Sequence, residues 1–90
     1  MNEDLIYSGQ IKLFPNPAEK QAQLEFNYDK KRKIEMIITD LLGQAISERS
    51  TFVIDQHGMK ILDLSLCKPG IYFINIMVEG QKGVIKLIVK

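Results

Sequence analysis

The chain has 90 residues, which is enough for one domain at most, since globular domains usually have about 100–200 residues. Hydrophobic residues make up 46% of it and charged residues 26%, an ordinary globular composition that argues against intrinsic disorder. The formal net charge is +1, so the composition carries neither the basic signal of a nucleic-acid-binding protein nor a strong electrostatic attraction to a membrane surface.

The chain offers little material for disulfides, metal sites or membrane spans. Its single cysteine excludes an internal disulfide and a cysteine-based zinc site. The longest uninterrupted apolar run covers only residues 71–74, far short of the about 20 residues that a transmembrane helix needs. The acidic start, with Glu3 and Asp4, does not resemble a signal peptide, so a domain that works outside the cytoplasm would belong to a longer precursor.

Alternation of apolar and polar residues, the period of a β-strand, dominates the chain. It predicts seven strands, in chain order, at residues 11–14, 21–28, 33–40, 45–51, 59–64, 70–79 and 84–90. The sixth is apolar on both faces, so it should lie in the middle of a sheet. In the fifth, Met59 and Ile61 are out of step with Leu62 and Leu64, which suggests a bulge.

The last predicted strand alternates clearly between a core face and a solvent face. Ile85, Leu87 and Val89 should face the core, whereas Lys86 and Lys90 should point to solvent. In the second and third predicted strands, the residues that should face the core are Ala22, Leu24, Phe26, Tyr28, Ile34, Met36 and Ile38.

Glycine, proline and aspartate mark the turns. Asp40 and Gly43 take the first and fourth positions of a type I turn, and Pro69-Gly70 fits the centre of a type II turn. Residues 80–83 form a short loop bounded by glycines. Seven short strands without a helix predict an all-β fold, an immunoglobulin-like antiparallel β-sandwich over residues 11–90, preceded by a flexible lead-in over residues 1–10.

The residue types give no basis for catalysis, a metal site or a cofactor. His57 and Cys67 could in principle form a base and a nucleophile, but His57-Gly58 is typical of a turn and Cys67 of a half-buried apolar residue. No phosphate-binding loop, metalloprotease motif or calcium-binding motif occurs. The basic run at residues 30–33 lies between two predicted strands without interleaved aromatics, so it indicates a solvated hairpin loop rather than a nucleic-acid site. We therefore expect neither an enzyme nor a partner of nucleic acid.

Three segments, taken in order, resemble a known family. The chain contains Leu-Phe-Pro-Asn-Pro-Ala at residues 13–18, Ile-Thr-Asp-Leu-Leu-Gly-Gln at residues 38–44, and Leu-Cys-Lys-Pro-Gly-Ile-Tyr-Phe-Ile at residues 66–74, before a terminal strand that ends at Lys90. The ordered set resembles the type A C-terminal sorting domain of the type IX secretion system of Bacteroidetes, over about residues 11–90. Two small departures are Phe14, where Tyr is common, and Cys67 beside the late turn.

The chemistry of these residue types also gives structural reasons for several of the motif residues. Pro15 and Pro17 cannot donate backbone hydrogen bonds, so the chain should leave the sheet there, and Asn16 can bond to nearby backbone. The Tyr72 ring can pack while its hydroxyl reaches water or backbone. The residues expected to carry recognition are Pro15, Asn16, Pro17, Asp40, Gly43, Pro69, Gly70, Tyr72, Lys86 and Lys90.

The resemblance implies a destination rather than a reaction. Such domains direct an attached N-terminal cargo from the periplasm through the outer-membrane translocon to the cell surface or the extracellular space. A sortase-like peptidase commonly removes them as the cargo is joined to an anionic lipopolysaccharide; we expect that cut within residues 1–10. The alternative is an accessory β-sandwich of a secreted hydrolase or adhesin that binds carbohydrate or protein.

Overall fold

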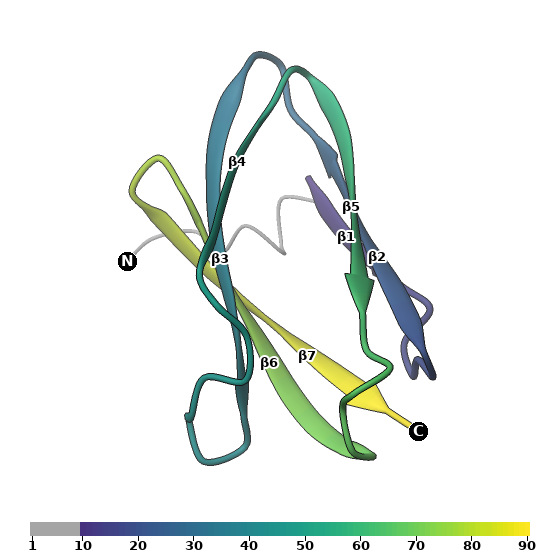
Figure 1. Ribbon diagram of the computed structural model, residues 1–90. Coiled ribbons are helices and arrows are strands. Elements are labelled where there is room, and N and C mark those ends of the chain that lie inside the picture. Colours follow the sequence, from purple (N-terminus) through teal and green to yellow (C-terminus); the bar gives the residue numbers. More distant parts are fainter. Residues whose placement is uncertain (1–9) are drawn as a thin grey trace.

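Seven antiparallel strands build the protein, in a computed structural model that describes residues 10–90 (Figure 1). In chain order they are β1 (Ile11–Phe14), β2 (Gln21–Asn27), β3 (Arg32–Asp40), β4 (Ser50–Ile54), β5 (His57–Asp63), β6 (Gly70–Val78) and β7 (Gln81–Val89). The described part of the chain contains no helix, and hence none long and apolar enough to cross a membrane.

The strands form two sheets that pack face to face. One sheet has the order β1-β2-β5, and the other has the order β4-β3-β6-β7. In immunoglobulin lettering these are A-B-E and C′-C-F-G, because the fourth strand pairs with the third strand rather than with the fifth. The predicted immunoglobulin-like β-sandwich is therefore confirmed.

The core lies between the sheets and follows the predicted alternation. All seven residues predicted to face inward from the second and third strands are buried. Across the core, the rings of Phe26 and Phe52 meet edge to face with centroids 5.8 Å apart. Buried side chains from both sheets thus exclude water from one continuous apolar layer, which is the main source of stability in a domain of this size.

The two C-terminal strands match their predicted places. β6 pairs with β3 on one side and with β7 on the other, as expected for a strand that is apolar on both faces. In β7, Leu87 and Val89 are buried and Ile85 packs against the core, whereas Lys86 and Lys90 are exposed. The predicted orientation of this strand is confirmed.

The fourth strand was predicted too early. It begins at Ser50 rather than at Ala45, because the chain after the Asp40 turn first runs beside the end of β3. There Ala45 forms a single bridge with Thr39, and the Ile46 N–H donates to the Ile38 carbonyl oxygen at 2.9 Å.

The fifth strand has no bulge, although its sequence contains two competing patterns of apolar residues. Its pairing with β2 runs without interruption from Gln21↔Asp63 to Asn27↔His57. The phase of Leu62 and Leu64 wins the core, and Met59 and Ile61 are exposed. Lys60 shares the inward phase and is half-buried, with its ammonium 5.2 Å from the Phe52 ring centroid. The inward phase therefore includes Lys60, whose cation–π contact accommodates it in a regular strand without the expected bulge.

The turn between β6 and β7 also differs from the expectation. The loop is not residues 80–83 but the pair Glu79-Gly80, with φ angles of +48° and +91°, closed by the pairing of Val78 with Gln81. Positive φ at both central residues is the geometry of a type I′ hairpin, which matches the twist of the flanking strands. Gly83 is instead buried within β7, opposite Ile76.

Candidate functional site

The motif residues, scattered along the sequence, come together at one end of the sandwich. Strand pairing sets Asp40 beside Tyr72 and Tyr72 beside Leu87, while Gly70 lies opposite Val89. The loops at this end are residues 15–20, 41–49 and 64–69, and the chain ends beside them at Lys90 (Figure 1). We call this region the motif end.

Asn16 joins the first loop to the last strand. Its side-chain amide nitrogen donates to the Lys86 carbonyl oxygen at 2.8 Å, and its side-chain oxygen accepts from the Ile88 N–H at 3.0 Å. The side chain thus imitates a peptide group on the outer edge of β7. Pro15 and Pro17, which flank Asn16 and cannot donate, follow the end of β1 at Phe14, so the chain leaves its first sheet where predicted.

Ala18 continues the contact that Asn16 begins. Its N–H donates to the Ile88 carbonyl oxygen and its own carbonyl accepts from the Lys90 N–H, both at 2.8 Å. Ala18 is buried and forms a parallel bridge with Val89. Residues 16–18 therefore cover the outer edge of β7 from Lys86 to Lys90, where an open edge would invite pairing with another chain.

Asp40 and Gly43 form the predicted turn after β3. The Gly43 N–H donates to the Asp40 carbonyl at 3.0 Å, and Gly43 has a φ of +88°. The Asp40 carboxylate accepts from the Leu42 and Gln44 N–H groups, each at 2.9 Å. Both hydrogen bonds that the structure shows to this carboxylate come from the turn itself, which supports the interpretation of Asp40 as a turn residue.

The predicted type II turn at Pro69-Gly70 is wrong. Gly70 has a φ of +157°, far from the about +80° of that turn, and it already pairs with Val89 as the first residue of β6. The Lys68 carbonyl instead accepts the Tyr72 hydroxyl at 2.5 Å. A tyrosine that bonds back to the backbone from the start of this strand is the tyrosine corner of immunoglobulin-like sandwiches.

The third loop surrounds a shallow hollow at the motif end, together with Ile46 and Tyr72. Asp63 accepts from the Ser65 N–H at 3.0 Å, and hydrogen bonds from Ser65 lower the pKa of the Asp63 carboxyl. Burial, and secondarily the Asp63 charge, raises the pKa of the Cys67 thiol. A raised pKa disfavours the thiolate, so Cys67 has the character of an inert packing residue.

The structure does not bring His57 and Cys67 together. His57 begins β5, and Cys67 follows the opposite end of that strand, whose seven residues span about 20 Å at about 3.3 Å each. His57 lies in the strand rather than in a turn, which corrects the sequence interpretation. Among residues 10–90, no group of three or more His, Cys, Asp or Glu side chains is placed to hold a metal ion.

The basic run at residues 30–33 lies at the opposite end from the motif residues. Lys30 and Lys31 are exposed in the β2–β3 loop, as predicted, whereas Arg32 and the exposed Lys33 already belong to β3. Arg32 differs because its guanidinium pairs with Asp29 and Glu79, each at 3.1 Å. It therefore links the β2–β3 loop to the β6–β7 turn. Sequence reasoning did not predict the ion pair of Arg32 with Glu79 or the hydrogen bonds of Ala18 with β7 and Lys90, because the partners lie far apart along the chain.

Three comparisons place this geometry among known proteins. The model of the family described as "Secretion system C-terminal sorting domain" matches residues 12–90. Among solved structures, the chain is similar to part of the crystal structure of a family 76 glycoside hydrolase from a bovine Bacteroides thetaiotaomicron strain, with 20% identity and a TM-score of 0.51. That match covers 90% of this chain and 19% of the hydrolase chain, and it shows the fold alone. None of the curated proteins compared with the chain matches it.

Proposed function

Because the chain belongs to the C-terminal sorting domains of the type IX secretion system, we propose that it carries a fused N-terminal cargo through the periplasm to the outer-membrane translocon. Membership in this family implies export through the outer membrane to the cell surface or the outside. The match over residues 12–90 is the observation that carries the proposal.

The motif end supports the idea of an address that is read as a folded surface. Three loops and the end of the last strand meet there, so motif residues far apart in the chain form one end of the sandwich, with Tyr72 buried beneath it. The Asn16 side chain holds the last strand in place from outside. Leu42 and Leu66 are 84% and 97% exposed on two of the loops, and exposed leucines of this kind suit contact with a protein partner.

Processing belongs to the same proposal. A sortase-like peptidase removes the domain once the cargo has crossed, and the cargo is then anchored at the cell surface. The cut is expected within residues 1–10, of which only Gln10 falls in the described part of the chain. From Ile11 to Phe14 the backbone is paired with β2, and paired backbone cannot enter a protease cleft without local unfolding.

A fusion experiment tests the proposal. A reporter protein with an export signal is fused in front of the full chain and produced in a cell that has the type IX machinery. We expect the reporter at the cell surface or in the medium, and in the periplasm when the chain is omitted. Periplasmic retention of the complete fusion would contradict the proposed function. The similarity to a glycoside hydrolase does not favour the accessory-module alternative, since it shows only the fold.

A further inference from the structure

The outer face of the four-stranded sheet is both apolar and basic. Its outward side chains are mostly apolar, and the exposed or half-buried apolar members are Ile37, Val53, Ile71, Phe73, Met77, Val84 and Ile88. The charged side chains around them are Lys33, Arg49, Lys82, Lys86 and Glu35. Four positive charges thus surround this face, and the one carboxylate is paired with Arg49 at 3.5 Å.

The outer face of the other sheet has a different character. Lys12 and Glu25 are paired across β1 and β2, and Asp63 adds a second carboxylate. Exposed apolar residues such as Met59 and Ile61 stand there among glutamine and asparagine side chains. The combination of an apolar centre with a basic border is therefore specific to the four-stranded sheet.

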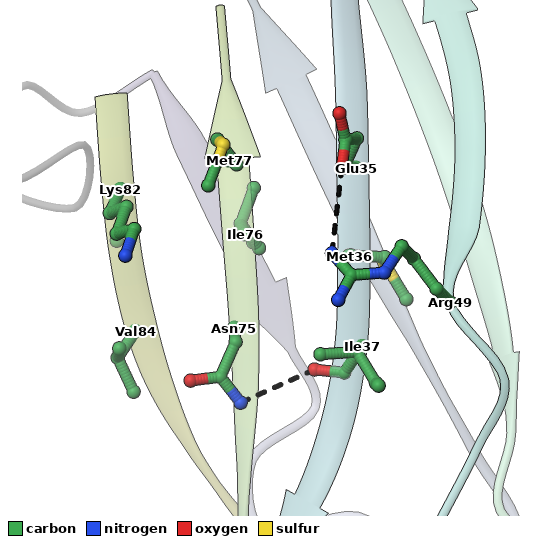
Figure 2. A pocket seen from close by; sticks show the side chains of 10 residues that line it. Glu35, Met36, Ile37, Arg49, Asn75, Ile76, Met77, Lys82 and Val84 are labelled. Carbon is green, nitrogen blue, oxygen red and sulfur yellow. Dashed lines mark hydrogen bonds and ion pairs between the residues drawn. The ribbon is translucent and has the colours of Figure 1, made fainter. Parts of the chain in front are cut away.

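A hollow of about 190 Å³ lies in the middle of the four-stranded face, between β3, β6 and β7. At about 30 Å³ for each water molecule, this volume corresponds to about six waters or one large side chain. Asn75 stands at its centre, and its amide nitrogen donates to the Thr39 hydroxyl oxygen at 3.2 Å. Figure 2 shows the Asn75 carbonyl oxygen pointing away from Ile37, toward β7. No donor within the described part of the chain reaches that oxygen, so it can accept from a partner.

A second copy of the chain does not fit this face. Two copies placed face to face would oppose like charges, which is unfavourable. Four strands of five to nine residues at spacings of about 4.8 Å give a face of roughly 400 Å² in projection, a small area beside the about 800 Å² of accessible surface per partner in a stable interface. A small apolar and basic face instead suits transient docking of a segment that carries apolar and acidic side chains.

We propose that this face docks an apolar, acidic segment of a protein in the secretion machinery. This inference rests on the proposed function and extends the recognised surface from Ile71, Phe73 and Lys86, which belong to the motif segments and recognition residues, to Lys33, Lys82 and Val84, which do not. Apolar side chains of the segment enter the hollow beside Val84, its carboxylates face Lys82 and Lys33, and one of its donors bonds to the Asn75 carbonyl oxygen. The small area allows release of the domain after translocation, because affinity depends on few contacts.

The test uses the reporter fusion with two matched double variants. The face variant is Lys82→Glu with Val84→Glu, and the control is Lys30→Glu with Ile61→Glu, two residues outside this face. Both make the same change in charge, and all four side chains are exposed. We expect both to melt near the wild type, and the face variant alone to lower surface delivery of the reporter about tenfold, since like charges would then face the partner.

The outcomes separate this inference from the proposed function. If the wild-type fusion stays in the periplasm, the proposed function fails. If the wild type is delivered and the face variant is delivered equally well, or if the control fails to the same extent, the docking face is wrong. Should the face variant unfold, Lys33→Gln with Lys82→Gln provides a milder test with the same expected direction.

Lipid binding is the competing explanation for a basic apolar face. The purified full chain is therefore sedimented with phosphatidylcholine vesicles, with and without phosphatidylglycerol. The proposal expects no binding to either kind of vesicle. Binding to the anionic vesicles that the face variant abolishes would overturn the protein partner in favour of an anionic lipid surface.

Discussion

The Asn16 side-chain nitrogen lies 2.8 Å from the Lys86 carbonyl oxygen, although 70 positions separate the two residues. Together with the bond from the Ile88 N–H, this contact holds the first loop against the last strand. We expect Asn16→Ala to lower the free energy of unfolding by about 1 kcal/mol, because two exposed hydrogen bonds are lost to water. Urea denaturation of the purified domain measures the change.

Asn27→Ala is the matched control for Asn16→Ala. Asn27 is exposed on β2 and its side chain makes no hydrogen bond within the described chain, so we expect a change within about 0.5 kcal/mol. Asn16→Asp adds a second check, since it keeps the acceptor for Ile88 but has no donor for Lys86. If all three variants were as stable as the wild type, the two Asn16 hydrogen bonds would contribute nothing to folding.

We expect opposite effects from removing the hydroxyl groups of Tyr28 and Tyr72, which are both buried. Tyr72→Phe removes the hydroxyl that bonds to the Lys68 carbonyl, so we expect a loss of about 0.5–1.5 kcal/mol in the free energy of unfolding. The Tyr28 hydroxyl is buried and has no partner among residues 10–90, so Tyr28→Phe should be neutral or stabilising because it removes an unsatisfied polar group. Thermal unfolding of the pair checks both, and a larger loss for Tyr28→Phe would contradict the assigned roles.

Cys67 should react slowly with alkylating agents. Its thiol pKa is raised, chiefly by burial and then by Asp63, so at a given pH the folded protein holds less thiolate than the unfolded chain. Folding thus favours the neutral thiol, and this contribution to stability is present at neutral pH and is lost as the pH rises through the thiol pKa. We expect iodoacetamide to modify Cys67 faster in guanidinium than in buffer; equal rates would contradict the pKa shift.

Local patterns predicted most of this fold, because a strand with one buried face leaves a period of two in the sequence. The strand beginning at Gln21 and both faces of β6 follow from that period alone. The early placement of β4 has a different origin. Ile46 fits a strand pattern but is exposed, since the chain there follows the end of β3 as a loop.

Sequence motifs indicate candidate recognition residues, but they do not show how these residues are arranged in space. The turn chemistry of Asp40 and Gly43 is local and could be read directly from four positions. The partners of Asn16 could not, because its bonds go to backbone groups of a distant strand, and any strand edge offers such groups. The docking face is hidden for the same reason, since it combines side chains of β3, β6 and β7 that only the sheet order brings together.

Processing gives a prediction about the start of the domain. Because β1 pairs with β2 from Ile11 to Phe14, we expect the first residue of a released domain to fall within residues 1–10. N-terminal sequencing of the domain recovered from the medium of a producing cell identifies the cut. A first residue beyond Ile11 would show that cleavage occurs inside the sandwich and that the proposed boundary is wrong.

The last prediction concerns Lys86 and Lys90 at the end of β7. Truncation of this strand is ambiguous, because it also removes Leu87 and Val89 from the core, and loss of buried aliphatic side chains costs about 1–5 kcal/mol each. Charge reversal separates recognition from folding. The side chains of both lysines are exposed. Asn16 and Ala18 bond only to backbone groups of Lys86 and Lys90, so Lys86→Glu with Lys90→Glu leaves these hydrogen bonds intact.

We expect the charge-reversed domain to melt near the wild type, since exposed charges contribute under about 1 kcal/mol to folding. A reporter fused to it should nevertheless stay in the periplasm if the machinery contacts this end of β7, where Lys86 also borders the docking face. The matched control is Lys30→Glu with Lys31→Glu, two exposed lysines at the opposite end of the sandwich, which should be delivered normally. Normal delivery of the Lys86 and Lys90 variant would show that these lysines only solubilise the domain, and that recognition at the motif end depends on its loops.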